Sequence, residues 1–363
     1  MEEWLSGYRF QIKYNLAESG MRDLTLKQLL NLCNETSDCL DDLLLEDMPT
    51  TGSQYLRKAI ADCYENLDPE RVMVTTGTGE ALFVFFNTVL SAGDEVVTSF
   101  PAFQALYEVP KAIGAKLKFY EHRIEDNFVF DPIRFSELIG NETKLVIINS
   151  PHNPTGAECS AESMKIIVDK ARKVGAKVLF DEHYRFLPHD GRDIISSGIE
   201  MGEDMFATGS ITKCFGAMGL RVGWLVGEPQ MLYKCRDMRD YLTHTLSPIS
   251  EKITALALEN RKTIIGKSIE ILQQNKITLG KFMHQMSDLF TYVAPESGLV
   301  CFPKVTLDMP SQKLAKLLIE NAEVFCLPAH SFEMEHHLRI GLGSEPESFT
   351  VALERIAQAL RKV

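Results

Sequence analysis

The chain has 363 residues, 45% of them hydrophobic, and its 38 basic and 50 acidic side chains give a net charge of −12. A chain of this length can bury a large core and form two domains, whereas its acidic balance, without any Lys/Arg-rich cluster, argues against nucleic-acid binding. No apolar run is long enough to cross a membrane and the N-terminus lacks the pattern of a secretion signal, so we expect a cytoplasmic protein. The eight cysteines form no CxxC pair and no zinc-type cluster, which indicates reduced thiols and no metal site.

Residues 1–20 mix aromatic, charged and small residues without a clear period, and we expect an irregular arm there. Helical apolar patterns follow at 24–33 and around 55–65. Seven short β-rich runs then alternate with helical stretches such as 80–90 and 161–175. The runs are RVMVT (71–75), EVVTSF (95–100), KLKFY (116–120), KLVIIN (144–149), KVLFD (177–181), MFATGS (205–210) and VGWLVG (222–227).

These runs contain few polar residues, which predicts an α/β fold with a mainly parallel, seven-stranded sheet between helices. Such a sheet places its site at the carboxyl ends of its strands. Long helices are expected next, at 230–243 and 247–288, followed by a smaller α+β region. We therefore expect three parts, which are an N-terminal arm with part of the small domain (1–45), a large cofactor-binding domain (46–245) and a small C-terminal domain (246–363).

The most informative segment is SITKCFGAMGLRVGW (210–224). A lysine just beyond a strand, with a hydroxyl three residues before it and an arginine eight after it, suits a Schiff-base cofactor site, because the lysine must reach an aldehyde while nearby donors hold a phosphate. Taken alone, Lys213 is equally well explained as a solvated loop residue. Upstream, however, NSPHNPTG (149–156) and DEHY (181–184) lie at the ends of two expected strands.

The ordered set GTGEA, PAF, NPTG, DEHY, SITK with Arg221, and RIGLG runs over nearly the whole chain. With these motifs the chain resembles the fold-type-I pyridoxal 5′-phosphate (PLP) enzymes of the class I/II aminotransferase superfamily. The resemblance implies PLP as cofactor, a small amino-acid substrate and a homodimer.

The resemblance also gives the matching residues roles. Lys213 would form the Schiff base with PLP and later move the proton at the substrate's Cα. Asp181 would pair with the pyridinium nitrogen, because a cationic ring is the stronger electron sink. Asn153 and Tyr184 would donate hydrogen bonds to the ring 3′-oxygen. Phe103 would stack on the ring face, although an isolated phenylalanine is more often a core residue.

A phosphate site is expected where the loop TTGTGEAL (75–82) opens a helix, because the helix N-terminus offers free amides and a favourable dipole. The amides of Thr78 and Gly79 would bind the phosphate, together with the side chains of Ser210 and Arg221. Arg339, in HLRIGLG, matches the arginine that holds the substrate's α-carboxylate by a bidentate contact.

Two positions depart from the aminotransferase pattern. Asp47 stands where many relatives have a tyrosine that reaches the phosphate of the neighbouring subunit. His183, within DEHY, replaces a small or aliphatic residue. Since side chains at i and i+2 of a strand end point the same way, His183 can share the site with Asp181 as a general acid and base. The alternative is a hydrogen-bonded core histidine.

The segments YNLAESGMRDLTL and MRDYLTHTLSP (238–248) resemble the capreomycidine-synthase branch of the superfamily, and within it the enduracididine-forming cyclodehydratases of guanitoxin-type pathways. These enzymes build cyclic arginine derivatives. On this resemblance, Glu18 would pair with the substrate's guanidinium and Thr25 would orient its hydroxyl as a catalytic residue. The alternative for both is a surface or helix-capping role.

The resemblance favours a cyclodehydratase that converts a hydroxylated L-arginine, 4-hydroxyarginine first, to a cyclic guanidino amino acid such as L-enduracididine. Lys213 would remove the α-proton, and His183 would protonate the leaving hydroxide. An ordinary aminotransferase, which passes an amino group to a 2-oxo acid, uses the same cofactor residues and needs no special role for His183. A non-enzymatic scaffold would not need Lys213, Asp181 and Arg221 together.

Overall fold

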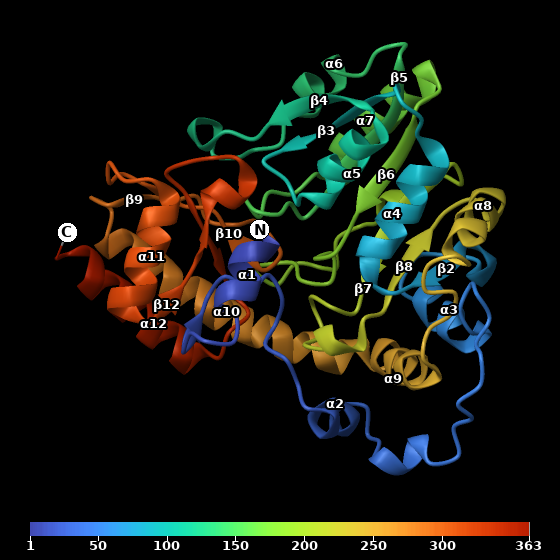
Figure 1. Ribbon diagram of the computed structural model, residues 1–363, viewed down its shortest axis with the longest axis horizontal. Helices are drawn as coiled ribbons and strands as arrows, with labels where there is room; N and C mark the ends of the chain where they lie inside the picture. Colours follow the sequence, from blue (N-terminus) through green and yellow to red (C-terminus); the bar gives the residue numbers. More distant parts are fainter. Residues whose placement is uncertain (363) are drawn as a thin grey trace.

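The computed structural model describes residues 1–362 and is built around one seven-stranded sheet (Figure 1). The strand order is β2-β8-β7-β6-β5-β3-β4. The neighbouring strands β4, β3, β5, β6 and β7 run parallel to one another. Strand β8 is antiparallel to both β7 and β2. All seven lie on the expected runs, which confirms the predicted α/β class. Their bounds are β2 (Val72–Thr75), β3 (Glu95–Phe100), β4 (Lys116–Glu121), β5 (Thr143–Asn149), β6 (Lys177–Asp181), β7 (Met205–Ser210) and β8 (Gly223–Val226).

Helices cover both faces of the sheet, as the inner strand β5 illustrates. Leu145 and Ile147 point into one apolar cluster, whereas Val146 and Ile148 point into the other. A strand buried on both faces needs apolar residues throughout, which explains its nearly uninterrupted apolar sequence. On the Leu145 side lie α4 (Gly77–Val89), α5 (Ala105–Ile113) and α8 (Pro229–Arg239), and on the other side α3 (Gln54–Ala61), α6 (Pro132–Glu137) and α7 (Ala161–Val174).

The C-terminal part begins with two helices, α9 (Pro248–Glu259) and α10 (Arg261–Gln285). The single helix expected over 247–288 is therefore wrong. Asn260 interrupts it with a non-helical backbone (φ −98°, ψ 18°), and its side chain donates a hydrogen bond of 2.9 Å to the Leu256 carbonyl. The remaining elements are β9 (Phe290–Thr291), β10 (Val300–Cys301), β11 (Lys304–Val305), α11 (Ser311–Ala322), β12 (Val324–Phe325), β13 (Leu327–Pro328), β14 (Leu338–Gly341) and α12 (Pro346–Leu360).

The N-terminal arm is more ordered than expected, because residues 1–20 form α1 (Glu2–Tyr8) and β1 (Tyr14–Asn15). The helix buries Leu5, and its two aromatic side chains pack on Phe325. Strand β1 pairs in parallel with β12. The arm is thus attached to the C-terminal part of the chain, and α1 lies between this part and the large sheet (Figure 1).

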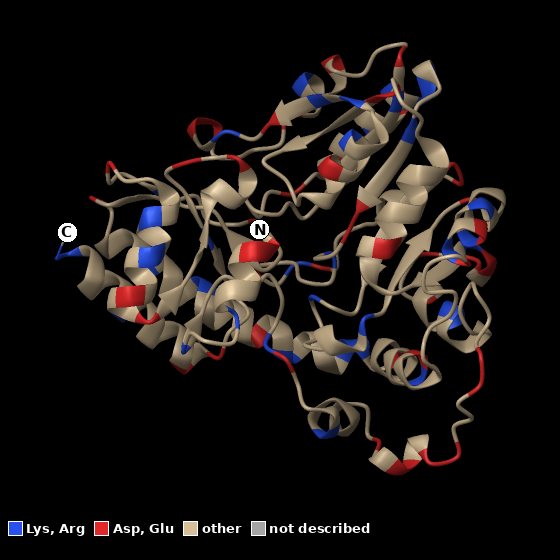
Figure 2. Ribbon diagram, viewed as in Figure 1, with Lys and Arg blue, Asp and Glu red and all other residues tan. Residues whose placement is uncertain are grey.

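The chain then forms α2 (Leu26–Leu32), which leads into an acidic segment that Figure 2 shows as a run of red before α3. Elsewhere basic and acidic residues alternate over the outer helices (Figure 2). Among the described residues, 1–362, no helix has the length and apolar character needed to span a membrane. Short 3₁₀ turns complete the structure, at η1 (Ser37–Leu40), η2 (Pro69–Arg71), η3 (Ile124–Asp126), η4 (Gly198–Met201), η5 (Met218–Leu220) and η6 (Ala329–Phe332).

Candidate active site

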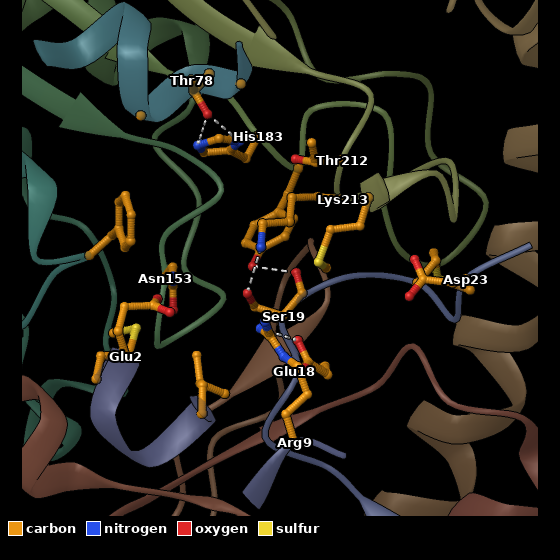
Figure 3. A pocket seen from close by; sticks show the side chains of 18 of the residues that line it. Glu2, Arg9, Glu18, Ser19, Asp23, Thr78, Asn153, His183, Thr212 and Lys213 are labelled. Carbon is orange, nitrogen blue, oxygen red and sulfur yellow. Dashed lines mark hydrogen bonds and ion pairs between the residues drawn. The ribbon is translucent and has the colours of Figure 1, made fainter. Parts of the chain in front are cut away.

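A cavity of about 760 Å³ opens at the carboxyl ends of the parallel strands, between the large sheet, the N-terminal arm and β14 (Figure 3). This is the position expected for an open α/β sheet. Among the residues proposed from sequence, all except Ser210 and Thr25 line it. Those that do are Glu18, Thr78, Gly79, Phe103, Asn153, Asp181, His183, Tyr184, Lys213, Arg221 and Arg339.

Asp181 ends β6 and is fully buried. Its carboxylate accepts hydrogen bonds from Thr208 Oγ1 at 2.8 Å and from Asn149 Nδ2 at 3.0 Å. Both donors occupy the register positions beside Asp181, on β7 and β5. A buried carboxylate gains most from a cationic partner, and within residues 1–362 only His183 lies within ion-pair distance. The position therefore fits a protonated ring nitrogen.

The phosphate end of the cavity is formed by the start of α4. Thr76 precedes this helix without making a side-chain cap, so the amides of the first turn are free for an anion. Gly77 has φ +72°, and a Cβ atom there would lie 3.0 Å from a guanidinium nitrogen of Arg221. Amides and guanidinium thus meet at one point, which suits a phosphate. Ser210 does not line the cavity itself, but its hydroxyl lies 2.7 Å from that of Thr212, which does.

The His183 ring lies among the same groups, as predicted from its i+2 relation to Asp181. Its Nε2 is 3.1 Å from Asp181 Oδ1 and 3.0 Å from Thr78 Oγ1, and its Nδ1 is 3.3 Å from Ser210 Oγ. Burial lowers the pKa of His183, while the Asp181 charge acts in the opposite direction. These contacts hold the ring on the cofactor side of the cavity. A role as the acid for a leaving hydroxide stays a prediction.

Lys213 projects toward the middle of the cavity, where its Nζ donates a hydrogen bond of 3.0 Å to Ser19 Oγ (Figure 3). Burial and the nearby positive charge of Arg339 lower the pKa of Lys213 to about 8. A large share of the amine is then neutral at slightly basic pH, as a nucleophile and base requires. The Ser19 carbonyl also accepts a hydrogen bond of 2.9 Å from the Tyr184 hydroxyl.

Arg339, on β14, is almost fully buried. One terminal nitrogen donates to the Ala17 carbonyl at 2.6 Å, and the other donates to Asn153 Oδ1 at 3.2 Å. Its Nε has no hydrogen-bond partner within residues 1–362. A buried guanidinium with an unused donor, in a cavity wall, fits the carboxylate of an amino acid.

Glu18 lies at the opposite end of the cavity from Thr78 and His183 (Figure 3). Its two oxygens accept from Arg9 Nε at 2.6 Å and from Arg9 Nη2 at 3.1 Å, which is a bidentate ion pair. Asn15 Nδ2 adds a third bond of 3.2 Å. The Glu18 carboxylate raises the pKa of Arg9.

Thr25 does not line this cavity, and the catalytic role expected for it stays a prediction. The residue is exposed and precedes α2 as its N-cap. Its hydroxyl accepts from the Gln28 amide at 3.2 Å, and the Gln28 side chain accepts from the Thr25 amide at 2.9 Å. This reciprocal capping box is the alternative that sequence reasoning had left open.

Several site residues were not found from sequence. Asn149 and Thr208 can be found only once the strand register is known, because each lies beside Asp181 in the neighbouring strand. Ser19 directly follows Glu18, so its place beside an expected site residue was a usable signal. Arg9 carried no signal, because it belongs to a segment without a clear period.

The model of the aminotransferase class I and II family matches residues 11–356 of the chain. Capreomycidine synthase from Streptomyces vinaceus is 28% identical over 362 residues, which cover 99% of this chain and 93% of that protein. An aspartate aminotransferase from Pyrococcus horikoshii is 27% identical over 341 residues, with coverage of 91% and 87%.

Two solved structures are similar in both fold and length. A PLP-dependent aminotransferase from Streptococcus suis superposes with a TM-score of 0.94 at 28% identity, and the PLP-dependent cyclase OrfR with a TM-score of 0.93 at 27% identity. Each comparison covers 99% of this chain and 96% of the other. Because the family model covers nearly the whole chain and the cavity fits PLP, the chain belongs to the aminotransferase class I and II family of fold-type-I, PLP-dependent enzymes.

Proposed function

We propose that the protein is a PLP-dependent cyclodehydratase that converts a hydroxylated L-arginine, 4-hydroxyarginine first, to a cyclic guanidino amino acid such as L-enduracididine. The observation that carries this proposal is the Glu18 carboxylate. It lines the end of the cavity away from Thr78 and His183, which we call the substrate end, and it binds a guanidinium group, that of Arg9, through both oxygens. Similarity to capreomycidine synthase and to the cyclase OrfR supports the same chemistry.

Two opposite charges would orient the substrate. Arg339, with its unused Nε donor, would take the α-carboxylate. Glu18 would take the guanidinium at the other end of the side chain. Lys213 projects between the cofactor end of the cavity and Glu18, so its amine would face the substrate's Cα (Figure 3). Binding at two points removes much of the substrate's freedom before reaction.

PLP, when bound, holds the substrate's amino nitrogen and accepts the electron pair that remains after Cα loses its proton. Lys213, with a pKa of about 8, would remove that proton. A hydroxyl on Cβ would then leave directly, whereas one on Cγ would leave after a further proton transfer from Cβ. The leaving hydroxide takes up a proton, which His183 is proposed to supply. The guanidine nitrogen attacks the resulting electrophilic carbon and loses a proton, and the carbons that gave up protons take them back, so that the net change is the loss of one water.

An aminotransferase is the second candidate. It is supported by the S. suis structure and the aspartate aminotransferase from P. horikoshii. The same cofactor residues would serve it, and the reaction would require a 2-oxo acid. For either reaction we propose a homodimer, as the resemblance to fold-type-I enzymes implies.

The test is to mix the PLP-loaded enzyme with 4-hydroxyarginine, and separately with 3-hydroxyarginine, in deuterated buffer without any oxo acid. Loss of water, with deuterium retained on carbon, is the expected product mass, and the isomer that reacts defines the ring. Turnover that begins only when a 2-oxo acid is added, with an absorbance change to the pyridoxamine form, would instead identify an aminotransferase.

A further inference from the structure

We propose that Arg9 is an internal substitute for the substrate's guanidinium. The Arg9 guanidinium stays bound to the Glu18 carboxylate until a substrate displaces it. In this way Arg9 sets the preference of the site for substrates with cationic side chains. This inference rests on the proposed function in one respect, namely that the substrate carries a guanidinium group that binds Glu18.

The geometry of the pair supports exchange of one guanidinium for another. Arg9 uses Nε and one terminal nitrogen on the two carboxylate oxygens, at 2.6 and 3.1 Å. This fork arrangement is available to any guanidinium, including that of a substrate. Asn15 donates to Glu18 Oε1 at 3.2 Å, so Glu18 keeps one neutral donor when Arg9 leaves. Asn15 Nδ2 also donates to the Arg9 backbone carbonyl at 3.4 Å, so this contact to Glu18 depends on the Arg9 backbone but not on its side chain.

The strength of the pair is suited to displacement. The side chains of Arg9 and Glu18 are 31% and 27% exposed, so water and salt weaken their attraction. Such partly exposed pairs contribute little net stability. A substrate that also gains contacts at Arg339 and at the cofactor can therefore replace Arg9 at small cost.

The segment that carries Arg9 is short and held by few contacts. Helix α1 has seven residues, no side-chain cap at its start and one buried residue, Leu5, and Arg9 follows its last residue, Tyr8, as the C-cap. A helix this short is marginal without tertiary contacts, which here are made by Trp4 and Tyr8 on Phe325. Residues of α1 line the cavity, so the helix covers the substrate end (Figure 3). Movement of Arg9 would open this end.

Charge makes the exchange selective. When a guanidinium replaces Arg9, Glu18 exchanges one cation for another and the charge of the subsite is unchanged. A neutral side chain would leave the carboxylate without a cation, and a substrate carboxylate would add repulsion. Both therefore compete poorly with Arg9.

The test uses the holoenzyme and 5-guanidinopentanoate, which is arginine without its amino group and so binds without reacting. Isothermal titration calorimetry compares the wild type with Arg9→Ala, Glu18→Gln and, as a control, Arg123→Ala, whose guanidinium forms an exposed pair with Glu121. The neutral analogue 5-ureidopentanoate is the control probe. Removing Arg9 should tighten binding of the guanidino probe about fivefold, because the competitor is lost.

We expect Glu18→Gln to bind the guanidino and ureido probes equally, and Arg123→Ala to behave as wild type. Equal or weaker binding of the guanidino probe by Arg9→Ala would overturn the proposal, because Arg9 would then support Glu18 instead of competing for it. Arg9→Met, which keeps the apolar stem, repeats the test if the alanine variant folds poorly. Because the probe does not react, this result is independent of whether 4-hydroxyarginine is cyclised.

Discussion

The two ends of the cavity are built in different ways. At the cofactor end, Asn149, Asp181 and Thr208 are buried and belong to three neighbouring strands of the central sheet. At the substrate end, Arg9 and Glu18 belong to the N-terminal arm, and their side chains are about a third exposed. The first set is fixed by the backbone register, whereas the second is held by a short helix and a strand of two residues.

This difference separates a preorganised part from an adaptable one. A strand-end carboxylate keeps its direction because the ladder on each side is complete. The arm can exchange one ion pair for another without disturbing the sheet. On the proposed function, the cofactor end would stay the same within one fold while the arm selects the substrate, and Glu18, the carboxylate proposed to bind the substrate's guanidinium, belongs to this arm.

The largest effect is expected at the cofactor end, for Asp181→Asn. The amide keeps the size and some hydrogen bonds of the carboxylate but has no charge to hold the ring nitrogen protonated. Turnover should fall about 100- to 1,000-fold, as when a preorganised electrostatic contact is lost. Steady-state rates and the absorbance spectrum of bound PLP would be measured together.

Asp169→Asn is the matched control, since Asp169 forms an exposed pair with Lys165 on α7. Its rate should equal that of the wild type. If Asp181→Asn lost less than tenfold in turnover while binding PLP normally, the assignment of Asp181 to the ring nitrogen would fail.

A second prediction concerns the apoenzyme and the Lys213 amine. The pKa of Lys213 is lowered from 10.5 to about 8 by burial, so between these pH values the unfolded chain binds a proton that the folded chain does not. Unfolding then takes up a proton, and the apoenzyme becomes more stable as pH rises from 8 to 10.5. The shift corresponds to about 3 kcal/mol, and we expect about 2 kcal/mol because Lys213 is only partly buried.

Lys213→Met removes the amine and with it this pH dependence of stability. Below pH 8 the variant apoenzyme should be more stable than the wild type by about 2 kcal/mol, and the difference should shrink toward pH 10.5. Urea unfolding across this pH range measures it, with the exposed Lys165→Met as control. A difference that stayed constant with pH would show that Lys213 is not destabilised by burial.

The sequence was sufficient to predict the sheet and most of its end groups. Strands buried on both faces leave continuous apolar runs, and Lys213, Asp181 and Arg221 sit in motifs with fixed spacing. The break at Asn260 was missed because the apolar period continues through it. Thr208 was missed because its importance depends on strand register, which is a property of the assembled sheet.

The arm was harder to predict for a different reason. Its helix α1 is stabilised by contacts with Phe325, more than 300 residues away in sequence, and not by its own periodicity. The pairing of Arg9 with Glu18 likewise depends on how the chain turns between α1 and β1. Sequence reasoning therefore found Glu18 through resemblance but had no means to find Arg9.

The smallest predicted effect separates the arm's structural residues from its functional ones. Thr25→Ala removes the hydroxyl that accepts from the Gln28 amide, and loss of such a cap typically costs about 1 kcal/mol. Urea unfolding should detect this loss, whereas Thr25→Ser, which keeps a capping hydroxyl, should restore most of it. Because Thr25 is exposed and outside the cavity, kcat and KM should stay within about twofold of the wild type. A large fall in kcat for the alanine variant, rescued by serine without any change in stability, would return Thr25 to the catalytic machinery.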